Sequence, residues 1–221
     1  AAPPQLFLLR ARARISCADP EAALRCADEG IAHCKPGEKI TAALHNTAGE
    51  ASELSDQRKK ARLHFDTACE LIDEQADSWD ASAAHAGKAR QLSAADDFVA
   101  AAAAHGEEAR VLEKAGLPNA TARALAKRAV CMAQAGATEQ AIKELQRAAE
   151  RLSGAKNPSS SLLESQMLMG RVFRFAGKRD QAKKALSMAA EAAALHAATD
   201  IEGQARLGLA RLFLEGMPAQ G

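Results

Sequence analysis

The sequence contains no tyrosine, one tryptophan and six phenylalanines among its 221 residues. Its apolar runs are short, and none approaches the roughly 18 residues that a membrane-spanning helix requires. Neither sign of charge is in excess, since 29 basic and 28 acidic residues leave a net charge of +1. This balance does not attract the whole chain to nucleic acid or to an anionic lipid surface. We therefore expect neither a nucleic-acid partner nor an integral membrane segment.

Cysteine is scarce and irregularly spaced. An odd number without a CxxC pair does not resemble the disulfide framework of a small secreted domain. We expect reduced, buried thiols in a cytoplasmic protein at Cys17, Cys26, Cys34, Cys69 and Cys131. The chain begins with Ala1 instead of methionine, and the apolar stretch that follows is too short for a signal peptide. A trimmed or processed segment is therefore expected.

Signatures of catalysis and of metal binding are missing. The sequence has no GxxxxGK[ST], HExxH or GxSxG motif. The histidines are scattered, and the nearest ligand-like pair, His33-Cys34, is interpreted as structural. Asp96-Asp97 and Glu107-Glu108 are neighbours in sequence, so their side chains diverge on a helix and are interpreted as solvated. We expect no enzyme, no catalytic residue, no cofactor and no metal site.

Alanine, a strong helix former, is abundant, and turn signals interrupt the chain at regular intervals. Between these signals, apolar residues follow helical spacing, and no segment alternates with the period of a strand. The pattern predicts helices over 4–17, 20–34, 39–54, 57–75, 78–92, 95–115, 119–135, 138–153, 160–176, 178–197 and 200–215. Expected N-terminal caps are Asp19, Asn119, Ser159 and Asp200, and expected C-terminal stops are Gly136 and Gly177.

The helices form a repeating pattern of hairpins. Gly170, Phe173, Gly177, Ala182, Leu186 and Ala189 follow the order of Ala129, Met132, Gly136, Ala141, Leu145 and Ala148. A hairpin packs closely only where a small side chain lies at the helix crossing, and hairpins stack because one alone cannot bury its apolar face. The small crossing residue recurs as Ala11, Gly49, Gly87, Ala129, Gly170 and Gly208.

In the other hairpins, the same order of small and larger apolar residues recurs along the second helix, but less regularly. Ala61, Phe65 and Ala68 match it clearly, and Ala23, Ala27 and Gly30 match it weakly. In the third hairpin, the expected equivalents are Val99, Ala103 and Gly106. The predicted units lie near 4–34, 39–75, 78–115, 119–153 and 160–197, with a half unit at 200–215.

These motifs resemble the tetratricopeptide repeat (TPR), although the period is about 40 residues where the family's is 34. The longer repeat is similar to that of the soluble NSF attachment proteins, especially the gamma type, and to the sensor domains of maltose-regulator-type bacterial activators. The resemblance implies an all-α fold, a right-handed α-solenoid of about five and a half antiparallel hairpins forming one domain over residues 1–221. It implies a non-enzymatic scaffold or adaptor that binds a peptide or helix of another protein on its concave face.

Two alternatives remain open from the same resemblance. One is a vesicle-fusion adaptor in membrane trafficking, similar to the NSF attachment proteins. The other is a sensor module of a larger bacterial transcription regulator. A nucleotide-binding domain or a helix-turn-helix in the full reading frame would select the latter.

Basic residues on consecutive first helices form the predicted partner site. First helices line the concave surface of a hairpin solenoid, which is the usual binding face. The expected residues are Lys88, Arg123, Lys127, Arg171, Arg174 and Phe175. They indicate an acidic peptide or a coiled-coil segment as the partner, and the competing interpretation is a solvated helix face. Arg123 and Lys127 resemble half of the carboxylate clamp of TPR co-chaperones.

The last predicted helix, 200–215, carries apolar residues on more than one face. An exposed apolar patch at the end of a solenoid favours association with another chain. We therefore expect self-association through this helix, with Leu212 and Phe213 at the contact. The other account is that the natural protein continues and this chain is a fragment of it. A chain that stays monomeric would show instead that the helix folds back and buries its own apolar face.

Overall fold

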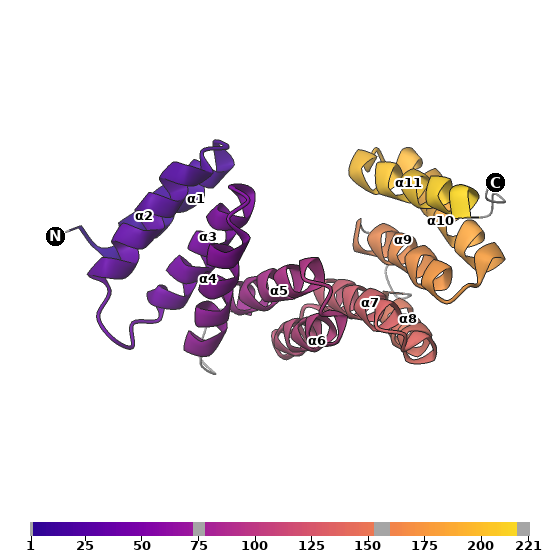
Figure 1. Cartoon of the computed structure of the whole chain (residues 1–221), viewed down its shortest axis with the longest axis horizontal. Coiled ribbons are helices and arrows are strands. Elements are labelled where there is room, and N and C mark those ends of the chain that lie inside the picture. The colour runs from indigo at the N-terminus through magenta and orange to yellow at the C-terminus, as the bar shows by residue number, and fades with distance from the viewer. Residues whose placement is uncertain (1, 73–77, 153–159, 216–221) are drawn as a thin grey trace, which may run out of the picture. The chain divides into compact units, whose positions relative to one another are not determined.

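A computed structural model of the chain describes residues 2–72, 78–152 and 160–215. It is 85% helical. Within the described residues there is no strand. The helices, labelled in Figure 1, are α1 (Pro4–Ser16), α2 (Pro20–His33), α3 (Ile40–Leu54), α4 (Arg58–Leu71), α5 (Ser78–Ala94), α6 (Phe98–Lys114), α7 (Pro118–Gln134), α8 (Thr138–Leu152), α9 (Ser160–Phe175), α10 (Arg179–Leu195) and α11 (Thr199–Glu215). The predicted all-α fold is confirmed, and each predicted helix is present with shifted ends.

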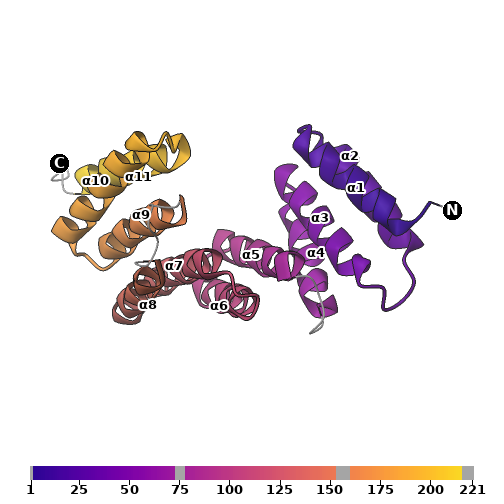
Figure 2. The same ribbon diagram turned by 180° about the vertical axis from the view of Figure 1, so that it is seen from behind.

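Helix contacts divide the chain into two compact units, Ala1–Asp97 and Phe98–Gly221. In the first unit, each of α1 to α4 packs on the helix that follows it, and α1, α3 and α5 also pack in series. In the second unit, α6 to α11 pack in the same sequential way, and α7, α9 and α11 form the corresponding series. Figure 2 shows the same helices from behind. Contact of each helix hairpin only with the hairpins next to it in sequence is the pattern of an α-solenoid. The single-domain organisation stays a prediction.

The turns that separate helices contain residues with left-handed backbone. Gly136 and Gly177, both predicted as stops, have φ of 88° and 69°. Glycine adopts this conformation without the steric cost that a Cβ brings. Asp56 and Asp96 occupy the equivalent turns with φ of 55° and 60°, and Ala18 does so with φ of 57°. The turn geometry therefore repeats even where glycine does not.

The helix starts confirm one predicted cap and correct another. Asp19 Oδ1 accepts a hydrogen bond from the Ala22 amide at 3.1 Å and caps α2. Asn119 is not a cap, because α7 begins at Pro118 and Leu117 precedes it. Proline has a helical φ and needs no amide partner, so it starts the helix earlier than the Asn signal implies. Asp200 lies in the first turn of α11, and Ser159 lies outside the described residues.

The left-handed turn residues align the second helices of the repeats. Five positions after each turn residue lies a fully buried alanine, namely Ala23, Ala61, Ala101, Ala141 and Ala182. Nine positions after it lies a buried larger residue in four of the repeats: Phe65, His105, Leu145 and Leu186. The predicted alignment is therefore correct for the first, second, fourth and fifth hairpins, with Ala27 in the place of the larger residue in the first.

The predicted alignment of the third hairpin is wrong by two residues. Val99 is 72% exposed and Ala103 is also exposed. The buried equivalents are Ala101, His105 and Glu108. The reason is that Asp96 takes the left-handed position and α6 begins only at Phe98, later than its sequence suggests.

The glycines at the predicted crossings lie where no side chain fits. A Cβ on Gly49 would meet the Phe65 ring at 2.8 Å, and one on Gly87 would come closer still to the same ring. A Cβ on Gly170 would lie 2.7 Å from Leu186 Cδ2. These separations are shorter than the van der Waals contact of two carbon atoms. The expectation that small residues lie at the helix crossings is confirmed.

Candidate binding surface

The predicted basic residues lie on odd-numbered helices, but in two different units. Lys88 is on α5, in the first unit, and its ammonium lies 2.8 Å from Asp66 Oδ1. The hydrogen bond to Asp66 raises the pKa of Lys88, against a smaller opposing effect of burial. Its charge is thus compensated inside its own unit. The other predicted residues all belong to the second unit.

On α7, Arg123 and Lys127 lie one helical turn apart. The Arg123 guanidinium is 3.7 Å from Glu164 on α9, so it is loosely paired across two adjacent helices. Lys127 is half-buried and has no acidic partner within the described residues. Because α7 packs against α9, the two cations and the arginines of α9 lie on neighbouring helices of one series.

Arg174, near the end of α9, is held in place by two groups. Its Nη1 donates to Glu215 Oε1 of α11 at 2.6 Å, and its side chain is only 14% exposed. Its guanidinium carbon lies 4.7 Å from the centroid of the Phe175 ring, a cation–π geometry. Phe175 is itself half-buried and packs against the core of the second unit. Both predicted residues thus contribute to packing as well as to surface charge.

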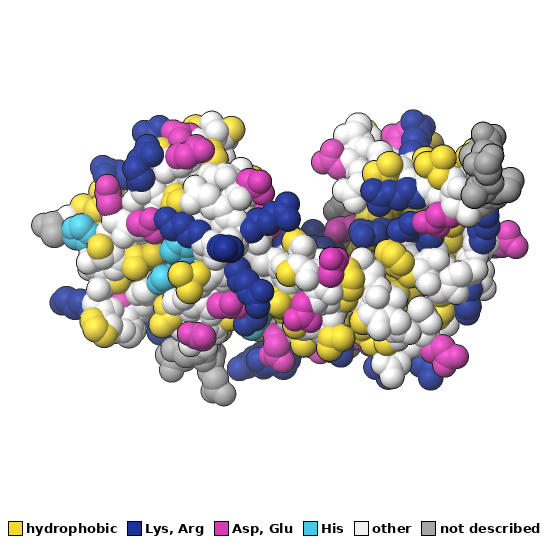
Figure 3. Space-filling view, in the orientation of Figure 1, with side chains coloured by type: hydrophobic (Ala, Val, Ile, Leu, Met, Phe, Trp, Pro, Cys, Tyr) yellow, Lys and Arg dark blue, Asp and Glu magenta, His cyan; other side chains and the backbone are white. Residues whose placement is uncertain are grey.

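A small cavity lies between α9 and α11. Its volume is about 130 Å³, and it is lined by Met167, Arg171, Arg174, Gln204, Leu207, Gly208 and Arg211. We call its polar side, formed by Arg171, Arg174, Gln204 and Arg211, the arginine pocket. Figure 3 shows dark-blue Lys and Arg side chains gathered over these two helices.

The charge of the arginine pocket is only partly balanced. Within the described part of the chain, neither Arg171 nor Arg211 has an acidic partner, whereas Arg174 has Glu215. Burial lowers the pKa of Arg171, and the charges of Arg174 and Arg211 lower it further. A half-buried guanidinium beside two others is an environment that favours an anion.

Sequence reasoning predicted Arg171 and Arg174 but missed Gln204 and Arg211. The sequence does contain a signal for these two residues, because positions 204, 207, 208 and 211 follow the spacing of one helix face. The pairing of this face with Arg171 and Arg174 depends on how α11 packs on α9, which is a tertiary property.

The first unit has a larger cavity of different character. It measures about 380 Å³ and is lined mostly by the connection between α2 and α3. Its charged residues, Lys35, Glu38 and Lys39, are of mixed sign. The cavity therefore lacks the single-sign charge of the arginine pocket.

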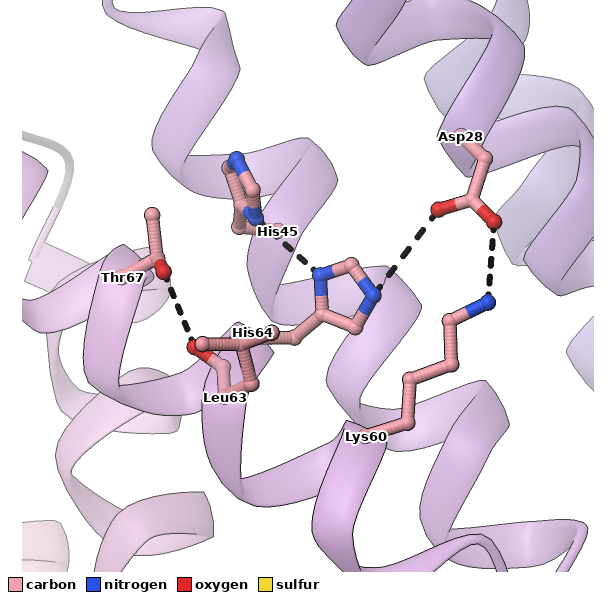
Figure 4. A network of polar contacts seen from close by, with 6 residues as sticks. All are labelled: Asp28, His45, Lys60, Leu63, His64 and Thr67. Atoms are coloured by element: carbon pink, nitrogen blue, oxygen red, sulfur yellow. Dashed lines mark hydrogen bonds and ion pairs between the residues drawn. The ribbon is translucent and has the colours of Figure 1, made fainter.

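A polar network joins α2, α3 and α4 in the first unit (Figure 4). The Nδ1 atoms of His45 and His64 lie 3.1 Å apart, and His64 Nε2 lies 3.8 Å from Asp28 Oδ1. Lys60 donates to the other oxygen of Asp28 at 3.1 Å. Burial is the main effect that lowers the pKa of both histidines. One ring must therefore accept at Nδ1 in its neutral form while the other donates.

We expect acid to destabilise the first unit through this histidine pair. A free imidazole titrates near 6.5, and both folded pKa values lie lower, so the unfolded state binds more protons just below 6.5. The free energy of unfolding should then fall as pH drops through about 6.5 toward the folded pKa values, and it should level off below them. Urea titrations at a series of pH values, followed by the fluorescence of Trp79, measure this slope.

The matched comparison for this prediction uses two variants. His64→Gln should reduce the slope between pH 7.5 and 5, whereas His196→Gln, at an exposed position on another unit, should leave it unchanged. Equal slopes in the parent and in His64→Gln would show that the pair does not control the acid response.

A second buried polar pair, His105–Glu108, was not predicted from the sequence. His105 Nδ1 and Glu108 Oε2 lie 2.7 Å apart, and the residues are 5% and 6% exposed. Glu108 was expected to be solvated, and this is wrong because it occupies the repeat position of Ala148 and Ala189. Burial of a carboxylate is tolerable here because the imidazole donates to it. If the repeats are aligned with Asp96 at the left-handed turn position, His105 and Glu108 fall on core positions of the repeat.

In the described part of the chain, none of the cysteines has the surroundings of an activated thiol. No disulfide joins any of the five, all of which lie within the described residues, but only Cys131 is buried, and Cys17 is exposed. The expectation of uniformly buried thiols is therefore wrong. Cys69 Sγ lies 3.6 Å from His85 Nδ1, and burial raises the pKa of Cys69 to about 11, which keeps it a thiol. Activated cysteines have lowered pKa values instead.

The described residues also bear on metal binding and on membrane insertion. Among residues 2–72, 78–152 and 160–215, no group of three or more His, Cys, Asp or Glu side chains is placed to hold a metal ion. None of the helices described combines the length and the apolar character needed to cross a bilayer.

The predicted self-association site needs one correction. Leu212 is only 6% exposed and belongs to the core cluster that contains Leu186 and Ala189. It therefore serves the internal packing of α11 and does not face outward. Phe213 is 64% exposed, and association through it stays a prediction.

Several solved structures are similar to this chain in fold. The apo form of RapI matches with a TM-score of 0.78 at 10% identity, covering 96% of this chain and 81% of that one. A Signal Transduction ATPase with Numerous Domains from Pyrococcus horikoshii, which has a TPR sensor, matches with a TM-score of 0.75 at 15% identity, covering 97% of this chain and 33% of that one. A TPR protein from Parabacteroides merdae matches with a TM-score of 0.64 at 12% identity, covering 97% and 80%.

Comparisons at the sequence level give no match. No protein-family model matches the sequence, and none of the curated proteins does. The structural likeness thus concerns the fold, and it agrees with the resemblance seen in the repeat motifs. The chain has a TPR-like, all-α helical-repeat fold.

Proposed function

We propose that this chain is a non-enzymatic protein-binding scaffold that binds an acidic segment of a partner protein on α7, α9 and α11. The observation that carries the proposal is the presence of Lys127, Arg171 and Arg211 on these helices without acidic partners in the described residues. Each of these helices packs on the next in the series, which supports a common binding surface for the three cations on the second unit.

The physical basis is electrostatic complementarity. Opposite charge across an interface speeds association and excludes wrong partners, and its effect falls with salt. Arginine is especially suited to carboxylate because its planar fork donates two hydrogen bonds at once. Arg123 and Arg174 contribute less free charge, since Glu164 and Glu215 already lie beside them.

A charge-reversal experiment tests the proposal. The probe is a fluorescent glutamate-rich peptide with one central serine, and its binding is followed by anisotropy. The double variant Lys127→Glu/Arg171→Glu should weaken binding by at least about tenfold, equivalent to roughly 1.4 kcal/mol. Reversal of Arg123 or Arg174 is avoided, because it would place two acidic groups side by side and disturb packing.

The matched control is Lys183→Glu/Lys184→Glu, which makes the same change of charge at two exposed positions of α10. It should leave the peptide affinity within about twofold of the parent, and binding should weaken as salt increases. If both double variants lose affinity equally, the peptide senses only net charge and the proposed surface is wrong.

A second candidate function is a sensor module within a longer regulatory protein. What supports it is the match of nearly the whole chain to one third of a signal-transduction ATPase that carries a TPR sensor. An ATPase domain or a helix-turn-helix encoded in the same reading frame would establish it. No observation favours the vesicle-fusion adaptor over these two.

A further inference from the structure

The arginine pocket differs from an ordinary basic surface in being concave and partly desolvated. Its wall on α9 is formed by Arg171 and Arg174, and its wall on α11 by Gln204 and Arg211. Arg171 is half-buried and the Arg174 side chain is 14% exposed. Met167 and Leu207 add apolar atoms to the lining, whereas Gln204, Leu207 and Arg211 on the α11 side are exposed. Half-buried cations such as Arg171 and Arg174 attract an anion more strongly than fully solvated ones do.

The number of unbalanced charges indicates the charge of the ligand. Glu215 neutralises Arg174, and two positive charges, those of Arg171 and Arg211, remain without a counter-charge in the described residues. A single carboxylate would balance one of them. A phosphate monoester carries about 1.5 to 2 negative charges at neutral pH and offers three acceptor oxygens.

The size and donor types of the pocket agree with this ligand. A space of about 130 Å³ is large enough for one compact anionic group. Guanidinium groups match phosphate oxygens in paired hydrogen bonds, and clusters of arginine are the usual means by which proteins bind phosphorylated side chains. The Gln204 amide adds a neutral donor at the rim.

We propose that the arginine pocket binds the phosphate monoester of a phosphorylated serine or threonine in the partner protein, with Arg171 and Arg211 as its charge partners and Arg174 as a donor fixed by Glu215. This inference rests on the proposed function, because the same surface that binds the acidic segment would place the phosphorylated side chain in the pocket. Phosphorylation of the partner would then control its capture by the scaffold.

The test uses four peptides that share one glutamate-rich sequence and differ only at the central position, which is serine, aspartate, phosphoserine or phosphothreonine. Isothermal titration calorimetry with the full chain gives each dissociation constant. We expect either phosphopeptide to bind at least about tenfold more tightly than the serine peptide, and the aspartate peptide to gain only a fraction of this. Inorganic phosphate should compete only at far higher concentration, since it lacks the peptide contacts.

Variants assign the effect to the pocket. Arg171→Gln and Arg211→Gln should each remove most of the preference for phosphate while leaving far-UV circular dichroism unchanged. Lys183→Gln on α10 serves as the control and should retain the preference. NMR signals of the arginine Nε–H groups should shift on addition of the phosphoserine peptide and not on addition of the serine peptide.

Each contrary outcome has a definite meaning. Equal affinity for the serine, aspartate and phosphorylated peptides, or a preference that survives Arg171→Gln, overturns the inference. If inorganic phosphate binds as tightly as the phosphopeptides, the pocket takes a free anion and the assignment to a partner side chain is wrong. If the serine peptide still binds and responds to Lys127→Glu/Arg171→Glu, the proposed function stands although the phosphate inference fails. If no peptide binds, the proposed function fails too.

Discussion

Replacement of Phe65 by alanine should lower the free energy of unfolding of the first unit by about 3–5 kcal/mol, the range for aromatic truncation in a core. Phe65 is 1% exposed, and its ring fills the space that the absent side chains of Gly49 and Gly87 leave open. The two glycines cannot close the resulting cavity, because neither has a side chain that could move into it. Chemical denaturation followed by fluorescence reports on this unit directly, since the only tryptophan, Trp79, lies on α5.

The control for this prediction is Leu63→Ala on the same helix. Leu63 is 65% exposed, so its truncation removes little buried surface and should change the free energy of unfolding by no more than about 0.5 kcal/mol. A loss below about 1 kcal/mol for Phe65→Ala would mean that the ring does not occupy the crossing of these helices.

Replacement of Gly170 by leucine should destabilise the second unit by about 1–3 kcal/mol or more, because it overpacks a full crossing. Even a Cβ at this position would lie 2.7 Å from Leu186 Cδ2, and the Leu186 backbone nitrogen is also near, at 3.3 Å. A side-chain rotation alone cannot relieve contact with a backbone atom. The thermal unfolding transition followed by circular dichroism measures the effect.

A second glycine of the same unit provides a control of opposite sign. A Cβ on Gly203, within α11, would have nothing within 4 Å of it. Gly203→Ala should therefore stabilise the chain by up to about 1 kcal/mol, since alanine favours helix and loses less backbone entropy on folding. The double variant Gly170→Ala/Leu186→Ala should lose less stability than the sum of the losses of the two single variants, because truncation of Leu186 removes the atoms that the new Cβ would meet. Strictly additive losses would show that Gly170 and Leu186 do not contact each other.

The repeat could be found in the sequence because its turns and its small residues are local features. Gly136 and Gly177 are visible signals of left-handed turns, and the hairpins that contain them were aligned correctly. The third hairpin was misaligned because its turn uses Asp96, which gives a weaker signal than glycine. That error hid the buried pair of His105 and Glu108, whose polar side chains also do not look like core residues.

The candidate site was predictable only in part. The spacing of Arg171 and Arg174 placed both on one helix face, as the structure shows. Their partners Arg211 and Gln204 lie at least 30 residues away in sequence, and only helix packing brings them to the same cavity. The same packing buries Leu212, which sequence reasoning had assigned to the surface.

The sequence by itself determined the all-α class, the number and approximate ends of the helices, and the small residues at their crossings. These properties follow from helix propensity, apolar periodicity and turn chemistry, which act over a few residues. Only the tertiary structure decided which charges are compensated, as for Lys88 by Asp66 and Arg174 by Glu215, and which remain, as for Arg171 and Arg211. The reason is that a long charged side chain finds its partner on a neighbouring helix, and helix spacing within one segment carries no information about that neighbour.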